Sequence, residues 1–68
     1  MYWVVEIQNN NGTWSQIITQ HPTLNEAESK YYTILSYAAV SDLTAHGAVL
    51  FDDKGIYHQQ KVYERGAE

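Results

Sequence analysis

The amino-acid sequence predicts an α+β fold in the order ββαββ, in which a four-stranded, mainly antiparallel sheet carries one helix on one face. Two pairs of aromatic and β-branched runs, each pair joined by a short turn-forming stretch, predict the strands. One amphipathic stretch between the two pairs predicts the helix. The chain has 68 residues, too few for a second domain, so we expect residues 1–68 to form a single domain with a flexible tail at 64–68.

The first pair of strands is expected to form a β-hairpin. Residues 2–8 are rich in aromatic and β-branched side chains, and residues 13–20 resume the same pattern. Residues 9–12 between them read Asn-Asn-Asn-Gly, and these residue types tolerate a positive φ. The sequence therefore predicts a hairpin loop of four residues or slightly fewer, and His21-Pro22 ends the second strand.

A helix is predicted over residues 24–40. Thr23 stands three residues before Glu26, which is the spacing of a capping box at a helix N-terminus. Six apolar residues then recur at three- and four-residue spacings, so they share one side of the helix and are expected to pack on the sheet. These residues are Leu24, Ala27, Tyr31, Ile34, Leu35 and Ala38.

The second pair of strands follows a polar connection at residues 41–46. Residues 47–51 are a short apolar strand, and residues 56–63 are the last strand. Asp-Asp-Lys-Gly at 52–55 is typical of a turn between them. The order of the four strands in the sheet stays open at this point, because long-range pairing and not local pattern decides it.

Apolar side chains alternate to both faces of the predicted sheet. The residues of the first strand divide into Trp3, Val5 and Ile7 on one face and Tyr2 and Val4 on the other. In the third strand Val49 and Phe51 are expected to oppose Ala48 and Leu50, and in the fourth Tyr57 and Tyr63 are expected to oppose Ile56 and Val62. One helix covers only one face, so the other face is predicted to stay apolar and uncovered.

The uncovered face predicts an interface. The chain is small and has no cysteine for a disulfide, so self-association is an expected source of stability. We therefore predict a homodimer or a larger oligomer, or a partner protein, on this face. The expected interface residues are Tyr2, Trp3, Trp14, Phe51, Tyr57 and Tyr63. The alternative is that some of them are scattered surface aromatics.

The charge of the chain restricts its partners. Eight Asp and Glu residues against four Lys and Arg residues give a net charge of −4, which opposes docking on DNA, RNA or an anionic membrane. No apolar run approaches the ~20 residues that cross a bilayer, and the first residues lack the features of a signal peptide. The sequence therefore predicts a cytoplasmic protein without nucleic-acid or membrane partners.

The sequence contains no catalytic motif. It has no Gly-rich phosphate loop, no GxSxG or HExxH motif and no cysteine nucleophile. A composite metal site between histidines and aspartates is geometrically open, but adjacent aspartates before Lys-Gly more often bond their own backbone in a turn. The residues concerned are His21, His46, His58, Asp42, Asp52 and Asp53. We expect no enzymatic activity, no cofactor and no metal.

Aromatic residues make up 13% of the chain, which in an acidic protein favours a small planar ligand or a protein partner over a long polyanion. Lys30, Tyr37 and Ser41 follow one flank of the buried side of the predicted helix, and His46 enters the next strand. Their ammonium, hydroxyl and imidazole groups are able to hold phosphate or ribose oxygens. The alternative is a solvated lysine, two boundary residues and a loop histidine.

The sequence also resembles a group of phage proteins. The matching segments are Glu26-Ala27-Glu28-Ser29-Lys30-Tyr31, Leu35, Ala38-Ala39-Val40-Ser41, His46 and Ala48-Val49-Leu50, with Trp3-Val4-Val5-Glu6-Ile7-Gln8 at the start. They are similar to small proteins encoded by phages and prophages of gut Firmicutes, and the resemblance implies a phage origin. Lys30, Tyr31, Ser41 and His46 match this pattern and have side chains able to contact a ligand, although periodicity places Tyr31 in the core.

Two functions are predicted from these observations. The first is a non-enzymatic homo-oligomer that sequesters a small nucleotide-derived immune signal, by analogy in size, acidity and oligomerisation with phage anti-Thoeris and anti-CBASS sponge proteins. Tight capture lowers the free concentration of the signal without breaking a bond. The second is an inhibitor or adaptor whose aromatic sheet face covers a host defence protein. A nucleic-acid mimic is disfavoured, because the eight acidic residues are spread along the chain.

Overall fold

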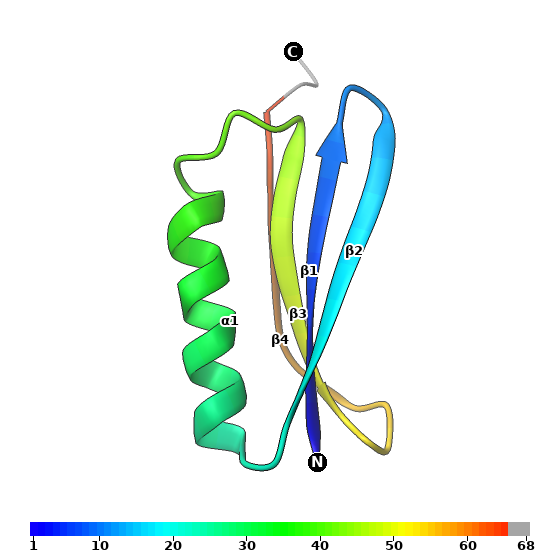
Figure 1. Cartoon of the computed structure of the whole chain (residues 1–68), viewed down its shortest axis with the longest axis vertical. Helices are drawn as coiled ribbons and strands as arrows, with labels where there is room; N and C mark the ends of the chain where they lie inside the picture. Colours follow the sequence, from blue (N-terminus) through cyan, green and yellow to red (C-terminus); the bar gives the residue numbers. More distant parts are fainter. Residues whose placement is uncertain (66–68) are drawn as a thin grey trace.

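Five elements form the described part of the chain, residues 1–65, in this computed structural model (Figure 1). They are β1 (Tyr2–Asn10), β2 (Thr13–His21), α1 (Leu24–Ala38), β3 (Ala45–Asp52) and β4 (Tyr57–Glu64). The strands form one sheet in the order β2-β1-β3-β4, and every neighbouring pair is antiparallel. The predicted ββαββ fold is confirmed. Residues 66–68 of the predicted tail lie outside the described residues.

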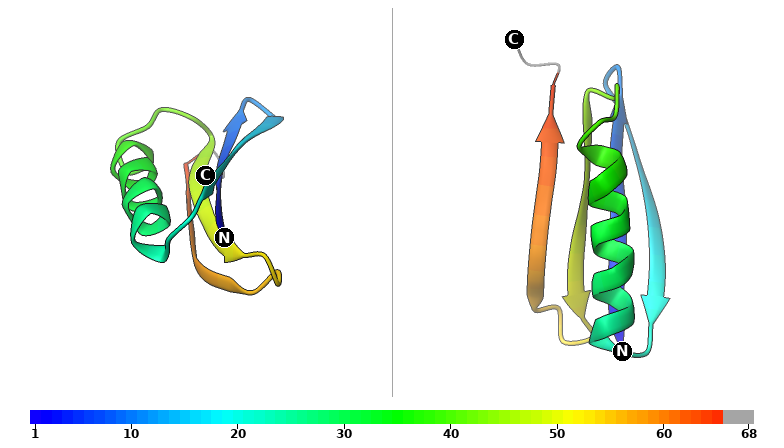
Figure 2. Two further views of the ribbon diagram at one scale, coloured as in Figure 1. Left: turned by 60° about the horizontal axis from the view of Figure 1, so that its bottom comes forward. Right: turned by 90° about the vertical axis from the view of Figure 1, so that its left-hand side faces the viewer.

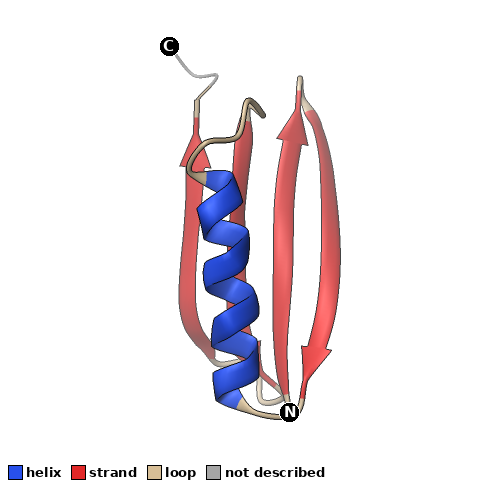
Figure 3. Cartoon of the chain, turned by 60° about the vertical axis from the view of Figure 1, so that its left-hand side comes forward, coloured by secondary structure: helices blue, strands red, loops and turns tan. Residues whose placement is uncertain are grey.

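The helix and the sheet form two layers. Figures 2 and 3 show α1 lying along the strand direction across one face of the sheet. No other element of residues 1–65 covers the opposite face. The two strands in the middle, β1 and β3, belong to different hairpins, so the sheet closes only when residues far apart in sequence pair.

The first hairpin turns over two residues, which makes its loop shorter than the four residues at the upper end of the prediction. Asn10 pairs with Thr13, so only Asn11 and Gly12 remain between the strands. Both have a positive φ, 55° at Asn11 and 94° at Gly12, as a type I′ turn requires. The side chain of Asn9 accepts a hydrogen bond of 2.8 Å from the Gly12 backbone N–H. An Asn-Gly pair therefore fixes the register of β1 against β2.

The helix begins at the predicted residue, Leu24, and ends at Ala38, two residues before the predicted end at Val40. Thr23 is the N-cap, and its hydroxyl accepts a hydrogen bond of 3.2 Å from the backbone N–H of Glu26. After Ala38 the chain tightens, because Val40 donates to the Tyr37 carbonyl and Ser41 donates to the Ala38 carbonyl. These bonds span three residues instead of four, as is common where a helix ends.

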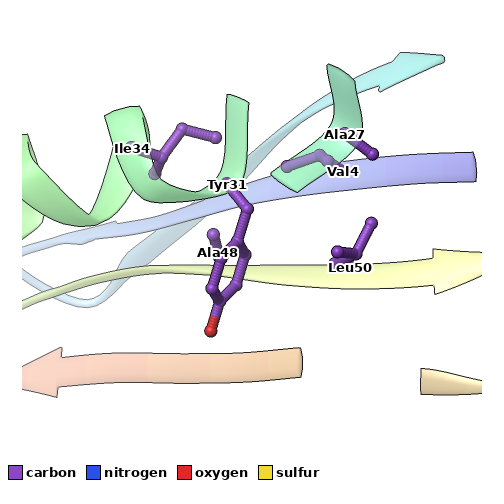
Figure 4. Close-up of a cluster of buried hydrophobic side chains, with 6 residues drawn as sticks. All are labelled: Val4, Ala27, Tyr31, Ile34, Ala48 and Leu50. Carbon is purple, nitrogen blue, oxygen red and sulfur yellow. The ribbon is translucent and has the colours of Figure 1, made fainter. Parts of the chain in front are cut away.

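The core lies between α1 and the middle strands (Figure 4). Its fully or almost fully buried members are Val4, Ala27, Tyr31, Ile34, Ala48 and Leu50, with Tyr2, Leu24 and Leu35 packed partly buried against them. Burying a side chain such as Ile34 or Leu50 stabilises the fold by about 1.5–3 kcal/mol. Burial raises the pKa of the Tyr31 phenol, and Tyr32 and Tyr63 add to this effect, so Tyr31 stays neutral. The helix residues predicted to face the sheet do so.

A β-bulge changes the faces of β4. The register shifts between Leu50, which pairs with Gln59, and Phe51, which pairs with Tyr57. One extra residue, His58, is accommodated there, so Tyr57 shares the face of Phe51 while Tyr63 lies on the helix side. The prediction that Tyr57 and Tyr63 share a face is wrong, because strict alternation does not hold across a bulge. The strand also begins at Tyr57 and extends through Glu64.

Gly47 allows β4 to approach β3 closely. A Cβ atom at this position would overlap the carbonyl oxygen of Lys61 and would lie 2.8 Å from the Cγ2 atom of Val62. The Lys61 carbonyl oxygen is a backbone atom, so it has little freedom to move aside. The strand pair therefore requires glycine at this position, although the residue lies in the interior of a strand.

Replacing Gly47 with alanine is expected to lower the free energy of unfolding by about 1–3 kcal/mol or more, because overpacking forces the two strands apart. Urea denaturation followed by circular dichroism measures the effect. Ser15→Ala on the exposed outer strand β2 is the control, because surface substitutions usually change stability by less than about 0.5 kcal/mol. A loss below about 0.5 kcal/mol in Gly47→Ala would show that β4 does not pack as described.

Candidate functional site: the open face of the sheet

The sheet face away from α1 carries large apolar side chains from all four strands. Val4 and Leu50 pair with each other and point into the core, so their neighbours along each strand point away from the helix. We call this surface the open face. Its large apolar residues are Trp3, Val5, Ile7, Trp14, Ile18, Val49, Phe51, Tyr57 and Val62.

Exposure on the open face is greatest at its edges. Trp14 is 58% exposed, Ile18 57%, Tyr57 63% and Val62 40%. These four side chains present on the order of 400 Å², because large side chains offer roughly 150–250 Å² each. The residues of β1 and β3 between them are half-buried by their neighbours. An apolar patch of this size is within the range of the largest patch on a typical monomeric protein, and such patches are often functional.

The open face is nearly free of charge. Its polar positions on the strands are mostly amides, at Asn9, Gln16, Gln20 and Gln60. Glu64, at the end of β4, is the single Asp, Glu, Lys or Arg side chain that the register places on this face among the described strand residues. The charges that give the chain its net −4 therefore lie mainly on the helix side and in the turns.

Four of the six predicted interface residues lie on the open face, and two do not. Trp3, Trp14, Phe51 and Tyr57 are on it, and the rings of Phe51 and Tyr57 lie 5.9 Å apart. Tyr2 packs on the core from the helix side and meets the His58 ring edge-on at 5.7 Å. Tyr63 is also on the helix side, as its pairing with His46 shows. There Lys61 lies 4.9 Å from the Tyr63 ring centre and Arg65 5.5 Å.

The predicted ligand-binding residues occupy different surroundings. His46 is only 6% exposed and donates through Nε2 to Glu6 Oε2 at 2.7 Å. The positive charge of Lys30 lies near enough to the same carboxylate to lower its pKa. Tyr37 is 61% exposed on the helix, and the Ser41 hydroxyl accepts a hydrogen bond from the Leu43 backbone at 3.1 Å. The structure thus gathers Lys30 and His46 around Glu6, and no contact among the described residues joins Tyr37 or Ser41 to them.

Glu6 is the polar centre that the sequence analysis missed. Burial raises the pKa of Glu6, but hydrogen bonds from His46 and Gln8 and the charges of His46 and Lys30 outweigh burial, so the pKa is lowered. Gln8 donates to the same oxygen as His46, at 2.9 Å. His46 Nδ1 is buried without a hydrogen-bond partner. The signal available in the sequence was a charged residue two positions from Val4, on the same face of a strand.

Asp52 organises the turn between β3 and β4. Its Oδ1 accepts from the backbone N–H of Lys54 at 2.9 Å and of Ile56 at 3.1 Å, and its Oδ2 accepts from His58 Nε2 at 3.0 Å. The hydrogen bond from His58 is the main cause that lowers the pKa of Asp52. Asp52 therefore bonds the backbone of its own turn, as expected for such residues. Residues 1–65 hold no group of three or more His, Cys, Asp or Glu placed to bind a metal.

Residues 1–65 enclose no pocket for a small ligand, and α1, the helix they contain, is not long and apolar enough to span a bilayer. No protein family, curated protein or solved structure matched the chain in the three comparisons made. The open face carries the three most exposed large apolar side chains of the strands, those of Trp14, Ile18 and Tyr57, and we take it as the candidate site.

The lowered pKa of Glu6 predicts a loss of stability in acid. The ordinary value is 4.5, so the contribution of the carboxylate is fully present above about pH 6 and is lost as the pH falls through the folded-state pKa. Urea midpoints measured between about pH 6 and pH 3 are expected to fall, and to fall less steeply in Glu6→Gln. Glu64→Gln is the control, since it removes an exposed carboxylate and should keep the wild-type slope. Equal slopes in Glu6→Gln and wild type would contradict the assignment.

Proposed function

We propose that this chain is a non-enzymatic protein-binding module that acts as an inhibitor or adaptor through its open face. One observation carries the proposal: large apolar side chains from all four strands form one surface with almost no charge. The cores of protein interfaces have this composition, because they are depleted in charged residues and enriched in Trp, Tyr and Phe.

The shape of the surface favours a protein over a small molecule. Small-molecule sites are concave and enclose most of the ligand, whereas the described residues enclose no pocket. A sheet face without a second layer presents its side chains in one broad array, which suits the flat surface of a protein partner. Trp14 and Tyr57, the most exposed aromatic residues of the open face, are of the types that most often contribute binding energy at interfaces.

The size of the open face supports a moderate interface. Its four most exposed side chains present on the order of 400 Å², and the half-buried residues of β1 and β3 add to this area. A standard interface buries about 800 Å² on each partner, which is the same order. Binding of this kind is stoichiometric and breaks no bond, so the chain acts by covering a surface that its partner needs.

The net charge of the chain indicates which charge its partner is expected to carry. The net charge is −4, and the open face itself is nearly uncharged, so the acidic groups lie mainly on the helix side and in the turns. A net negative charge favours a basic partner with an apolar binding surface, because complementary charge speeds encounter and excludes acidic competitors. A host defence protein, the class that the phage resemblance suggests, would be one such partner.

Sequestration of a nucleotide-derived signal stays a prediction. Lys30 and His46 lie near each other, but Glu6 places a carboxylate between the groups that would hold a phosphate. A ligand site of this kind would need further groups from another chain. Equilibrium dialysis against cyclic dinucleotides and ADP-ribose tests it directly, and binding that Lys30→Ala abolishes would favour this function over the protein-binding one.

The protein-binding function predicts that contacts form through Gln60, an exposed residue halfway along the outer strand β4 on the open face. A photo-crosslinking amino acid at this position is expected to yield adducts with a second kind of protein in native cells. Tyr57→Ser should reduce these adducts at least about tenfold, because truncating an aromatic anchor removes a large share of the binding energy. Mass spectrometry of the adducts gives the readout.

The matched control is Tyr37→Ser, which removes a tyrosine of nearly equal exposure, 61% against 63%, from the helix instead of the open face. It should leave the adducts unchanged. Adducts that contain only a second copy of this chain, or that survive Tyr57→Ser, would overturn the proposed function.

A further inference from the structure

We infer that β2 pairs along its outer edge with β2 of a second copy, in an antiparallel arrangement that joins two sheets into one of eight strands. This interface is separate from the open face. β2 is an edge strand of nine residues, Thr13–His21, and Figure 3 shows no element beyond it. Seven of its nine residues are exposed. The unpaired backbone groups of such an edge are a template for another strand.

The hairpin turn determines which backbone groups point outward. A two-residue turn closes on a hydrogen-bonded pair, here Asn10 and Thr13, and hydrogen-bonded and non-hydrogen-bonded pairs then alternate along the strands. Odd-numbered residues of β2 therefore direct their N–H and C=O groups toward β1, and even-numbered residues direct them outward. The outward set is Trp14, Gln16, Ile18 and Gln20.

The two edges of the sheet differ in protection. The outer strand β4 carries Lys61, Glu64 and a β-bulge at His58, all of which are features that block edge-to-edge pairing. β2 contains no Asp, Glu, Lys, Arg or Pro and no bulge. Its sequence is also rich in residues with high β-propensity, including Trp14, Ile17 and Ile18. One edge is closed to a further strand and the other is open to it.

The strand is self-complementary in register. An antiparallel pair centred on Ile17 aligns all nine residues and places each outward residue opposite another outward residue: Trp14 opposite Gln20 and Gln16 opposite Ile18 of the second copy. These four hydrogen-bonded pairs form roughly eight backbone hydrogen bonds, two for each pair. Any other register leaves part of the strand unpaired. Ile17 then faces Ile17 of the second copy on the helix side, next to the twofold axis.

Charge and symmetry favour a second copy over another extended segment. Two copies that each carry a net charge of −4 repel, but β2 has no Asp, Glu, Lys or Arg side chain to place near its counterpart. A twofold pair is closed, because the same strand is used on both sides. The protected edge at β4 then prevents addition of further copies, so the assembly stops at a dimer.

Cysteine substitution tests this arrangement, because the natural chain contains no cysteine. Cα atoms in a non-hydrogen-bonded antiparallel pair lie about 4.5 Å apart, within the range that a disulfide spans. Ile17→Cys should therefore oxidise to a covalent dimer at least about tenfold faster than Ile18→Cys, whose counterpart lies two residues away along the partner strand. The two isoleucines are matched, with exposures of 53% and 57%.

Sedimentation of cysteine-free protein gives the second measurement. Wild type should sediment at twice 7.8 kDa. Gln16→Pro removes an outward N–H and leaves the pairing with β1 intact, so it should weaken the dimer at least about tenfold relative to Gln16→Ala. Tyr57→Ser, on the far strand, should not weaken it. A monomeric wild type at about millimolar concentration would overturn the inference. Equal oxidation of Ile17→Cys and Ile18→Cys would also overturn it, and would indicate contact through the open faces.

Discussion

One helix has to cover a sheet of four strands, and it can cover only one face; the rest of the structure depends on this constraint. The 15 residues of α1 bury a core centred on Val4 and Leu50, which lie on the middle strands. Because strands alternate their side chains, each apolar residue placed in that core has a neighbour that faces the other way. A strand rich in apolar residues therefore builds a core and an uncovered apolar surface at the same time.

The same alternation explains why the polar site lies where it does. Glu6 follows Val4 on the helix side of β1, and His46 follows Ala48 in the opposite direction on β3, so the apolar face gives way to a polar one along the middle of the sheet. A carboxylate there is tolerated because the imidazole and the Gln8 amide satisfy it. With its Nε2 engaged by Glu6 and only 6% of its surface exposed, His46 is better suited to holding β1 and β3 together than to meeting a ligand.

Local pattern was sufficient to predict the elements, the helix cap at Thr23 and the side of α1 that packs on the sheet, because each depends on residues within one or two turns of each other. Features that depend on distant pairing were not predictable. The contact between Glu6 and His46 joins residues 40 positions apart, and the β-bulge at His58 appears only when β4 pairs with β3. The bulge then moved Tyr57 to the open face, which no alternating pattern in β4 indicates. The six predicted interface residues divide between the two faces for two reasons: ordinary alternation in β1 puts Tyr2 opposite to Trp3, and the bulge separates Tyr57 from Tyr63.

The open face and the outer edge of β2 do not compete for the same atoms. Pairing along the edge uses backbone groups in the plane of the sheet, whereas contact through the open face uses side chains perpendicular to that plane. A twofold axis perpendicular to the sheet keeps both helices on one side, so the two open faces join into one apolar surface in which Trp14 and Ile18 lie near the centre. Residues at the rim of one chain would then become the centre of a larger surface, where water is excluded most fully and aromatic side chains contribute most to binding. Edge pairing would in this way convert two moderate patches into a single bivalent site, and a partner with matching symmetry would be held more tightly than by either copy alone.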